Sequence, residues 1–351
     1  MPQPGLFDDD DSTRDAPAAR AKPVASGRGV VAAEPAADVL ELSRELGARF
    51  GGRLFLGTSS WYFPGWKGLV WAGDHSESVL SRRGLGAYAQ HPLLNAVSLD
   101  RSFYRPVDET TYASLAAQVP PAFRFVVKAA ALVTDAVIRE PGAGRAVLPN
   151  PQFLDPAAAV ELCVRPAVRG LGDKLGVLVF QLSPLPARWL DAPGDFIEKL
   201  EALWRAVVPE LPPSVQVALE LRDAAALTPA LARSLKAHRV RYCAGLHDRM
   251  PALVDQLPML RALWPGDLVC RWNLQRGLKY EAAKNQFEPF DTLQAPDPPT
   301  REELARIIVA TLAAGWRAFV TINNKAEGSA PLSVLELAKA ILAEVRRGEA
   351  R

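Results

Sequence analysis

The sequence predicts an α/β protein in which a TIM barrel, the (β/α)8 fold, spans residues 53–351. Eight strand-like runs alternate with helix-like runs without a break, and such alternation pairs neighbouring strands in parallel. The chain length of 351 residues also suits a barrel of about 250 residues with an extension. A doubly wound open sheet is the alternative fold, but the glycine-rich dinucleotide turn of that fold is missing after the first strand.

The region ahead of the barrel divides into two parts. Residues 1–38 are rich in Ala, Pro, Gly and Asp and lack a periodic apolar pattern, so they cannot bury enough surface to offset the entropy of ordering. We expect a disordered tail there. Residues 39–52 are expected to form a short lead-in helix, from about Val39 to Phe50, with Asp38 as its N-cap.

The barrel elements follow from short apolar runs separated by stretches with helical periodicity. The strands are expected at Arg53–Trp61, Leu94–Phe103, Phe123–Ala129, Gly176–Ser183, Val215–Arg222, Arg241–Asp248, Leu268–Leu274 and Ala318–Asn324. The helices are expected at Glu109–Val119, Asp155–Val168, Gly194–Val208, Pro229–His238, Arg301–Ala314 and Val334–Arg347. A capping box of Ser333 and Glu336 is expected to start the last helix.

Composition limits which partners and which cellular compartment we expect for the protein. The formal net charge of +2 is close to neutral, which gives no support for direct nucleic-acid binding. No apolar run approaches the roughly 20 residues of a membrane span, and the N-terminus lacks the apolar stretch of a signal peptide. Cys163, Cys243 and Cys270 lie far apart in apolar runs and are expected to be reduced core residues. We therefore expect a cytoplasmic protein without a membrane partner.

Strand alternation predicts which side chains face the inside of the barrel. In the fifth strand, Val217, Leu219 and Leu221 are expected to meet the helices, which turns Glu220 and Arg222 inward. Barrel enzymes place their sites where polar groups from several strands meet at the C-terminal ends. The same alternation places Lys128, Arg271, Asn273, Thr321 and Asn323 inside, and it puts Gln181 and His247 at the ends of strands four and six.

Several strand-end motifs resemble those of a known family. They are Leu56-Gly57-Thr58-Ser59-Ser60-Trp61 with Pro64-Gly65-Trp66, Phe103-Tyr104-Arg105-Pro106, Phe123 to Lys128 with Thr134, Phe180-Gln181-Leu182-Ser183-Pro184, Glu220-Leu221-Arg222, and Asn323-Asn324 with Gly328 and Ala330. Over about Leu54 to Leu342 and in this order, they are similar to the motifs of the YecE-like family (domain of unknown function 72). The resemblance implies a TIM barrel, and it implies no particular activity.

The chain departs from that family's pattern at several polar positions and is therefore expected to be a divergent member. Ser98 stands where the family usually has a glutamate, and Asp100 stands where it has an asparagine. Asp135 and Asp223 replace usual histidines, and Arg271-Trp272-Asn273 replaces the family's R-x-H-G. If those residues carry a shared reaction, the resemblance implies altered chemistry in this chain.

The catalytic candidates are Glu220, Lys128, His247 and Asp100. Glu220 is the acid/base candidate, Lys128 would hold an anion or act as a base or amine, and His247 with Asp248 would form a general-base pair. The structural alternatives are a buried ion pair with Arg222 for Glu220, neutralisation of Glu220 or Asp100 for Lys128, and a hydrogen-bonded structural residue for His247.

The substrate-binding candidates suit an anionic ligand. Cations outnumber carboxylates among the inward residues, loops after strands seven and eight often bind phosphate, and rim aromatics would stack on a ring. The alternatives are loop packing and turn formation. The same cations disfavour a magnesium ion on Asp100, Glu220 and Asp248, so neither metal nor cofactor is predicted. The candidates are Trp61, Tyr104, Gln181, Arg222, Arg271, Asn273, Asn323, Asn324 and Gly328.

These residues favour an enzyme, a hydrolase or a lyase, that acts on a polar anionic small molecule or a nucleotide-like group at the C-terminal mouth of the barrel. A barrel that binds a ligand without catalysis is one alternative. Another is an accessory protein of DNA maintenance, because Gln3-Pro4-Gly5-Leu6-Phe7 resembles the Q-x-x-L-F peptide that docks on the bacterial sliding clamp. In that case Leu6 and Phe7 would fill an apolar pocket and Gln3 would hydrogen-bond beside it.

Overall fold

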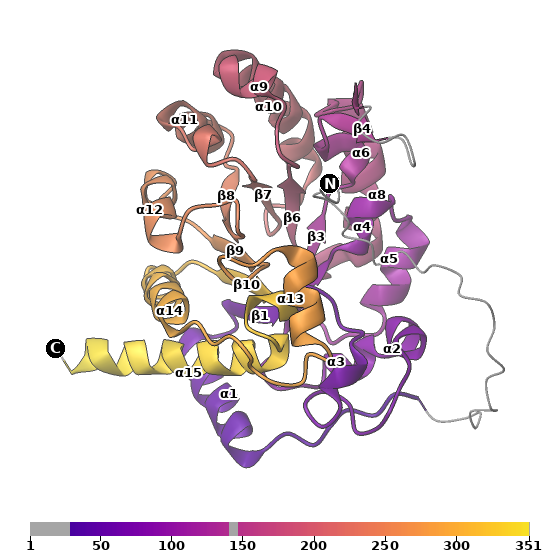
Figure 1. Cartoon of the computed structure of the whole chain (residues 1–351), viewed down its shortest axis with the longest axis vertical. Coiled ribbons are helices and arrows are strands. Elements are labelled where there is room, and N and C mark those ends of the chain that lie inside the picture. Colours follow the sequence, from indigo (N-terminus) through magenta and orange to yellow (C-terminus); the bar gives the residue numbers. More distant parts are fainter. Residues whose placement is uncertain (1–28, 140–146, 351) are drawn as a thin grey trace.

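The computed structural model describes residues 29–139 and 147–350. Its eight parallel strands close into a barrel in the order β1-β10-β9-β8-β7-β6-β3-β2, and helices surround the barrel (Figure 1). The predicted TIM barrel is confirmed. The strands are β1 (Leu54–Thr58), β2 (Ala96–Leu99), β3 (Arg124–Lys128), β6 (Leu175–Gln181), β7 (Gln216–Glu220), β8 (Arg241–Leu246), β9 (Leu268–Trp272) and β10 (Ala318–Ile322).

The helical layer alternates with these strands along the chain, and α14 and α15 lie side by side in it. Its longer members are α1 (Ala37–Phe50), α5 (Glu109–Ala116), α8 (Arg165–Leu171), α10 (Pro193–Val207), α11 (Pro229–Ala237), α12 (Leu253–Ala262), α13 (Tyr280–Phe287), α14 (Pro298–Ala313) and α15 (Ala330–Glu349). Shorter helices are α2 (Glu77–Arg83), α3 (Leu85–Tyr88), α4 (Arg101–Tyr104), α6 (Ala131–Thr134), α7 (Pro156–Ala159) and α9 (Ala187–Asp191), and a π-helical turn at Val160–Val164 joins α7 to α8.

A small antiparallel pair is added to the barrel after β3. It consists of β4 (Val137–Arg139) and β5 (Val147–Pro149), with Ile138 opposite Leu148. No strand was predicted in this region, because three-residue strands are too short to show an alternation.

The N-terminal boundary differs from the prediction. The predicted tail extends too far, because Ala32 bridges Trp71 and the Ala33 amide donates to the Val70 carbonyl at 2.9 Å. Helix α1 begins at Ala37 with Ala36 as its N-cap, so the prediction of Asp38 as the cap was wrong and Asp38 lies in the first turn. Residues 1–28, which include the predicted docking peptide Gln3, Leu6 and Phe7, lie outside the described residues.

Two other boundaries were also predicted wrongly. Strand β2 ends at Leu99 and the chain turns helical at Arg101, where a strand was expected to run to Phe103. Helix α15 begins three residues before Ser333, so the expected capping box does not form. Pro331 lies in the first turn of α15, where the fixed φ of proline favours helix initiation and its missing N–H has no cost.

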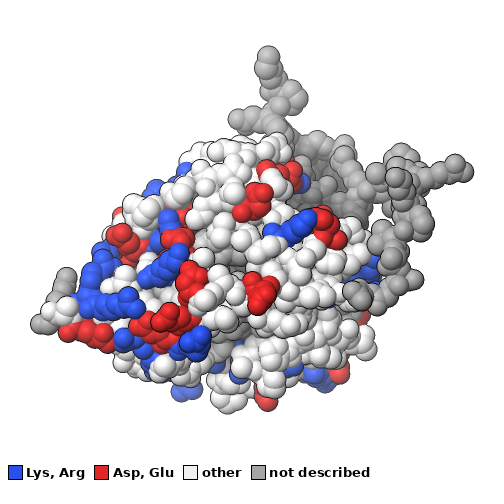
Figure 2. Space-filling view, turned by 90° about the horizontal axis from the view of Figure 1, so that it is seen from below, with Lys and Arg blue, Asp and Glu red and all other residues white. Residues whose placement is uncertain are grey.

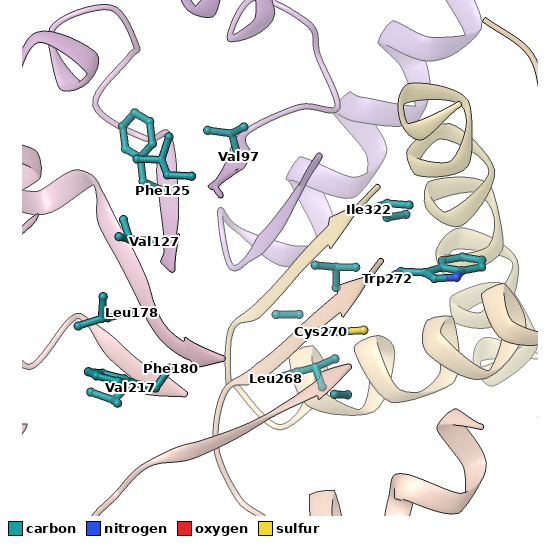
Figure 3. Packing of buried hydrophobic residues seen from close by; sticks show 14 of the residues in the cluster. Val97, Phe125, Val127, Leu178, Phe180, Val217, Leu268, Cys270, Trp272 and Ile322 are labelled. Carbon is teal, nitrogen blue, oxygen red and sulfur yellow. The ribbon is translucent and has the colours of Figure 1, made fainter. Parts of the chain in front are cut away.

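Alternation along the strands separates an outer core from an inner core. Val217, Leu219 and Leu221 belong to the cluster between barrel and helices, whereas Ala218 belongs to the cluster inside the barrel. Figure 3 shows Trp272 and other outer residues directed toward the surrounding helices. The predicted facing of the fifth, third, seventh and eighth strands is thus confirmed. The inner cluster consists of Phe55, Ala96, Val126, Val177, Val179, Ala218, Cys243, Val269 and Phe319.

The three cysteines are free and buried, as predicted. None of the helices in the described residues is long and apolar enough to cross a bilayer. Charges of both signs intermix on the face in Figure 2, most densely at one end of the molecule. Ion pairs join α1 to α15, with Arg346 on Glu45 and Arg49 on Glu349.

Candidate active site at the mouth of the barrel

A ring of polar side chains lies beyond the apolar inner cluster, at the C-terminal ends of the strands. We call it the polar ring and define it as Asp100, Lys128, Gln181, Glu220, Arg222, Arg271 and Asn273. Its members come from β2, β3, β6, β7 and β9 or from the residues that follow these strands. The structure therefore brings together, in one hydrogen-bonded and charged group, residues that the sequence placed on separate strands.

Glu220 lies at the centre of the polar ring and has no exposed surface. Its Oε1 is 2.6 Å from Nη1 of Arg222, and its Oε2 accepts a 2.6 Å hydrogen bond from Nη1 of Arg271. The side-chain amide of Asn273 donates to Oε1 at 3.1 Å. One carboxylate thus bridges two guanidinium groups that face each other inside the barrel.

The surroundings of Glu220 fix its protonation state. Burial alone would raise the pKa of the carboxyl, but the charges of Arg222 and Arg271 outweigh burial and lower the pKa to about 2. A group with this pKa carries no proton at neutral pH and accepts one reluctantly, whereas efficient acid/base groups have a pKa near the working pH. The geometry therefore favours Glu220 as the group that positions the guanidiniums.

Arg271 ties the ring together across the inside of the barrel. Its Nη2 donates to Oδ1 of Asp100 at 2.7 Å, and its Nη1 also donates to Oε1 of Gln181 at 3.0 Å. Burial would lower the pKa of Arg271, but Asp100 and Glu220 raise it, so the guanidinium stays charged. Gln181 Oε1 accepts a second bond, from Arg222 Nη2 at 3.0 Å, and therefore links the two arginines.

Position 100 carries a carboxylate that the resemblance did not imply. Ser98 donates through its hydroxyl to Oδ1 of Asp100 at 2.8 Å, the oxygen that also accepts from Arg271. The only carboxylate of this pair therefore comes from Asp100, directly after β2.

Lys128 is also buried, with 3% of its surface exposed. Its ammonium lies 4.0 Å from the centre of the Phe103 ring, and its charge contributes to the low pKa of Glu220. By formal charge, the polar ring therefore contains three cations and two carboxylates, and salt bridges join both carboxylates to arginines.

Gly245 on β8 lies against the ion pair of Glu220 and Arg222, where a side chain would not fit without displacing it. A β-carbon built at this position would lie 3.3 Å from Arg222 Nη1 and 3.4 Å from Glu220 Oε1. This distance is tighter than ordinary packing, so a larger residue at Gly245 would push against the pair. Sequence reasoning did not single out Gly245, although a glycine inside a strand signals a close approach of other atoms.

His247 belongs to a second cluster just beyond β8. Its Nδ1 lies 2.6 Å from Oδ1 of Asp248, and the other oxygen of Asp248 accepts from the Lys279 ammonium at 2.7 Å. The imidazole is about a fifth exposed. The predicted pairing of His247 with Asp248 thus exists, and the histidine is accessible to solvent.

The loop after β10 uses its predicted binding residues for internal contacts. Asn324 Oδ1 accepts from the Trp66 indole at 3.1 Å and from the Ala330 amide at 2.8 Å. Asn323 Oδ1 accepts from the Lys325 amide at 3.0 Å. Gly328 has a φ of +117°, and a β-carbon there would lie 2.5 Å from a backbone oxygen. These contacts fit the structural alternative of turn formation.

The two predicted stacking residues lie in different environments. Trp61 is 1% exposed, and its indole donates to the Leu80 carbonyl at 3.2 Å. Tyr104 is 52% exposed and is the ring that a ligand can reach from solvent. Arg101, which sequence reasoning missed because a strand was expected there, lies over Trp61 at 4.9 Å. Its only sequence signal is its place directly after Asp100.

Within the described residues, no group of three or more His, Cys, Asp or Glu side chains is arranged to hold a metal ion. The buried Nε of Arg271 and Oγ1 of Thr321 also have no hydrogen-bond partner there.

Comparisons with known proteins agree with the fold. The sequence model of a family described as "Protein of unknown function DUF72" matches residues 55–350. A DUF72 family protein from Thermotoga maritima MSB8 aligns with a TM-score of 0.55 at 18% identity, over 82% of this chain and 99% of that one. A DUF72 family protein from Enterococcus faecalis V583 aligns with a TM-score of 0.53 at 15% identity, over 82% and 95%. No curated protein sequence matches the chain.

Proposed function

The chain belongs to the family of proteins of unknown function DUF72, as its motifs predicted, and we propose that it binds a small polar anion or a nucleotide-like group at the polar ring and acts on it chemically. One observation carries the proposal: Arg222 and Arg271 face one buried carboxylate at the mouth of the barrel, 2.6 Å on each side. This arrangement holds two guanidiniums in fixed positions before any ligand arrives.

The charge of the ring supports an anionic ligand. By formal charge, the polar ring has three cations (Lys128, Arg222 and Arg271) and two carboxylates (Asp100 and Glu220), and four of these five side chains are buried. A ligand with a negative charge would therefore meet a site in which the cations outnumber the carboxylates. Fixed guanidiniums also match the planar geometry of carboxylate and phosphate oxygens.

The chemical step would depend on the second cluster. His247 is the candidate whose imidazole is both accessible and oriented by a carboxylate, Asp248, as a general base requires. Tyr104 would stack on a ring in the ligand. Glu220 and Asp100 would hold the guanidiniums in place, and Lys128 would add positive charge toward the bound anion. Hydrolysis or elimination at a bond next to the anionic group fits these roles.

Calorimetric titration with inorganic phosphate, pyrophosphate and adenosine monophosphate tests the binding step. We expect at least one of these probes to bind the wild type, and Arg222→Gln to weaken that binding about tenfold or more, because a charge-assisted hydrogen bond is lost. Arg233→Gln is the matched control. Arg233 is exposed on α11, so this substitution removes the same charge from a residue outside the polar ring. If no anionic probe binds, or if a neutral ligand co-purifies with the native protein by mass spectrometry, the proposal is wrong.

Turnover separates an enzyme from a barrel that only binds. A ligand identified in the purified protein would be incubated with wild type and with His247→Gln. We expect the wild type to convert the ligand and His247→Gln to bind it with little change but to convert it at least 100-fold more slowly, which is the low end of general-base catalysis. Binding without turnover by the wild type would favour the ligand-binding barrel.

The N-terminal peptide supports a second candidate function, which is docking on the sliding clamp. Gln3, Leu6 and Phe7 provide the polar and apolar contacts that such a peptide uses. A pull-down with purified clamp should recover the wild type and lose the double variant Leu6→Ala/Phe7→Ala. Equal recovery of both chains would remove this candidate and would leave the function of the polar ring untouched.

A further inference from the structure

A cavity of about 350 Å³ lies at the opposite end of the barrel from the polar ring. It opens between α12 and α14, beside the first residues of β8 and β9. Its walls are mostly apolar and include Leu257, Leu260 and Ile307, and Trp264 at its edge is 43% exposed. Small-molecule sites have volumes of about 300–1,000 Å³, so this cavity has room for a small ligand.

Arg241, the first residue of β8, lines this cavity and is fixed in place by backbone atoms. Its Nη1 donates to the carbonyl of Leu263 at 2.8 Å and to that of Pro265 at 3.2 Å. The guanidinium packs on Gly266 so closely that a β-carbon there would lie 1.9 Å from Cζ. The sequence thus provides a glycine where the guanidinium packs on the backbone.

Arg241 makes no direct ion pair with the described residues. Asp267 lines the same cavity, but Arg317 binds its carboxylate at 2.6 and 2.9 Å. Glu303 is paired with Arg306. Among residues 29–139 and 147–350, no carboxylate lies within 4.0 Å of Arg241, and the buried Nε of Arg241 has no hydrogen-bond partner. Burial lowers the pKa of this arginine, and the charge of Asp267 opposes that shift only in part.

A cation in the wall of an apolar cavity favours a ligand that has both an apolar part and a negative charge. We propose that this cavity binds a small apolar carboxylate, with the hydrocarbon part against Leu257, Leu260 and Ile307 and the carboxylate on Arg241. The hydrocarbon would remove apolar surface from water, and the carboxylate would accept hydrogen bonds from the guanidinium, including its unpartnered Nε. Two bonds of Arg241 hold the turn that follows α12, but they do not explain the open apolar space beside it.

Titration with octanoate and with octan-1-ol tests the proposal, because the two probes share a hydrocarbon chain and differ in charge. We expect octanoate to bind the wild type at a 1:1 ratio and about tenfold more tightly than octanol, as loss of a charge-assisted bond implies. Arg241→Gln should reduce octanoate affinity to that of octanol. Ala310→Phe, at an exposed position on the cavity wall, should abolish binding of both probes without affecting folding.

The exposed Arg233 provides the charge control, and Arg233→Gln should leave both affinities unchanged. Equal affinity of the wild type for octanoate and octanol would overturn the proposal. Octanoate binding that survives Ala310→Phe would do the same, even if Arg241→Gln fails to fold. If the wild type is a dimer that Ala310→Phe converts to a monomer, and octanoate does not bind, then a second copy of the chain covers the cavity and the proposal is wrong.

Discussion

The role of single residues in the polar ring is decided by their partners. Glu220 was predicted from strand alternation as an inward carboxylate with acid/base chemistry, and alternation does place it inside the barrel. What alternation cannot provide is the position of Arg222 and Arg271, one on each oxygen of Glu220. Those two charges change the expected chemistry, because they hold the carboxylate ionised. The positioning role that we propose for Glu220 rests on contacts, which a single sequence does not contain.

Replacing Glu220 with glutamine tests this role. Glu220→Gln leaves two buried guanidiniums without their shared counterion, and removal of one partner of a buried ion pair costs about 3–5 kcal/mol. We expect the free energy of unfolding in urea to fall by that amount. Glu302→Gln on α14 is the exposed control and should change it by less than about 0.5 kcal/mol. Similar stabilities of the two variants would contradict a positioning role.

The same carboxylate gives stability a defined pH dependence. Its pKa in the folded protein, about 2, is lower than its ordinary value of 4.5. The stabilisation is therefore fully present above pH 4.5 and is lost as the pH falls toward 2. The difference in unfolding free energy between wild type and Glu220→Gln should narrow over this window. A constant difference would mean that the carboxylate does not titrate there.

Gly245 offers a milder change at the same place. A methyl group at Gly245 would press on Arg222 and Glu220 from 3.3–3.4 Å, which shifts the ion pair without removing a charge. We expect Gly245→Ala to lower stability by about 1–2 kcal/mol and to weaken binding of the best anionic probe several-fold in calorimetry. If binding is unchanged while stability falls, the exact position of the pair does not control ligand affinity.

At the scale of the elements, the sequence predicted all eight barrel strands and their facing. Seven observed strands lie within the predicted ranges, and β6 begins one residue earlier, at Leu175. The predicted strands extend too far at their C-terminal ends, because polar residues such as Arg222 and Asn273 continue the alternation after the backbone pairing has stopped. Helix α12 was missed, since Pro258 lies inside it and interrupts the helical pattern.

Contacts between distant elements could not be predicted at all. Asp100 follows β2 and Arg271 lies on β9, and these strands are not neighbours in the barrel. Their 2.7 Å bond depends on closure of the barrel and on side-chain length. The same holds for the bond from Trp66 to Asn324, which joins residues 258 positions apart. Periodicity places a residue on a face, but closure decides which residues meet across it.

Packing of β1 against β2 depends on Gly57, a residue of the first strand-end motif. A β-carbon there would lie 1.9 Å from the carbonyl oxygen of Ala96, a clash that only backbone movement can relieve. We expect Gly57→Ala to lower the melting temperature strongly, with a loss of about 3 kcal/mol. The control is Gly47→Ala on α1, where no atom lies within 4 Å.

Gly47→Ala should stabilise the protein by about 0.5–1 kcal/mol, because alanine costs less entropy than glycine inside a helix. A Gly57→Ala variant as stable as the wild type would show that β1 and β2 can separate without affecting the barrel.

At the scale of the whole molecule, the barrel carries its two proposed sites at opposite ends. The polar ring lies at the C-terminal ends of the strands, and the cavity beside Arg241 lies near their N-terminal ends. Between the two, the inside of the barrel is filled by apolar side chains, including Phe55 stacked on Phe319 with 4.6 Å between ring centres. The two sites share no residue.

This separation predicts that the two ligands act independently. Each ligand at about 100 times its Kd should stabilise the protein by about 2.7 kcal/mol, and both together by about 5.4 kcal/mol, because sites without shared contacts are additive. Thermal unfolding with octanoate, with the best anionic probe, and with both measures the sum, and calorimetry of the probe at saturating octanoate checks its Kd. A Kd that changes more than about twofold would contradict independence. It would mean that the packed interior transmits a shift from one end of the barrel to the other.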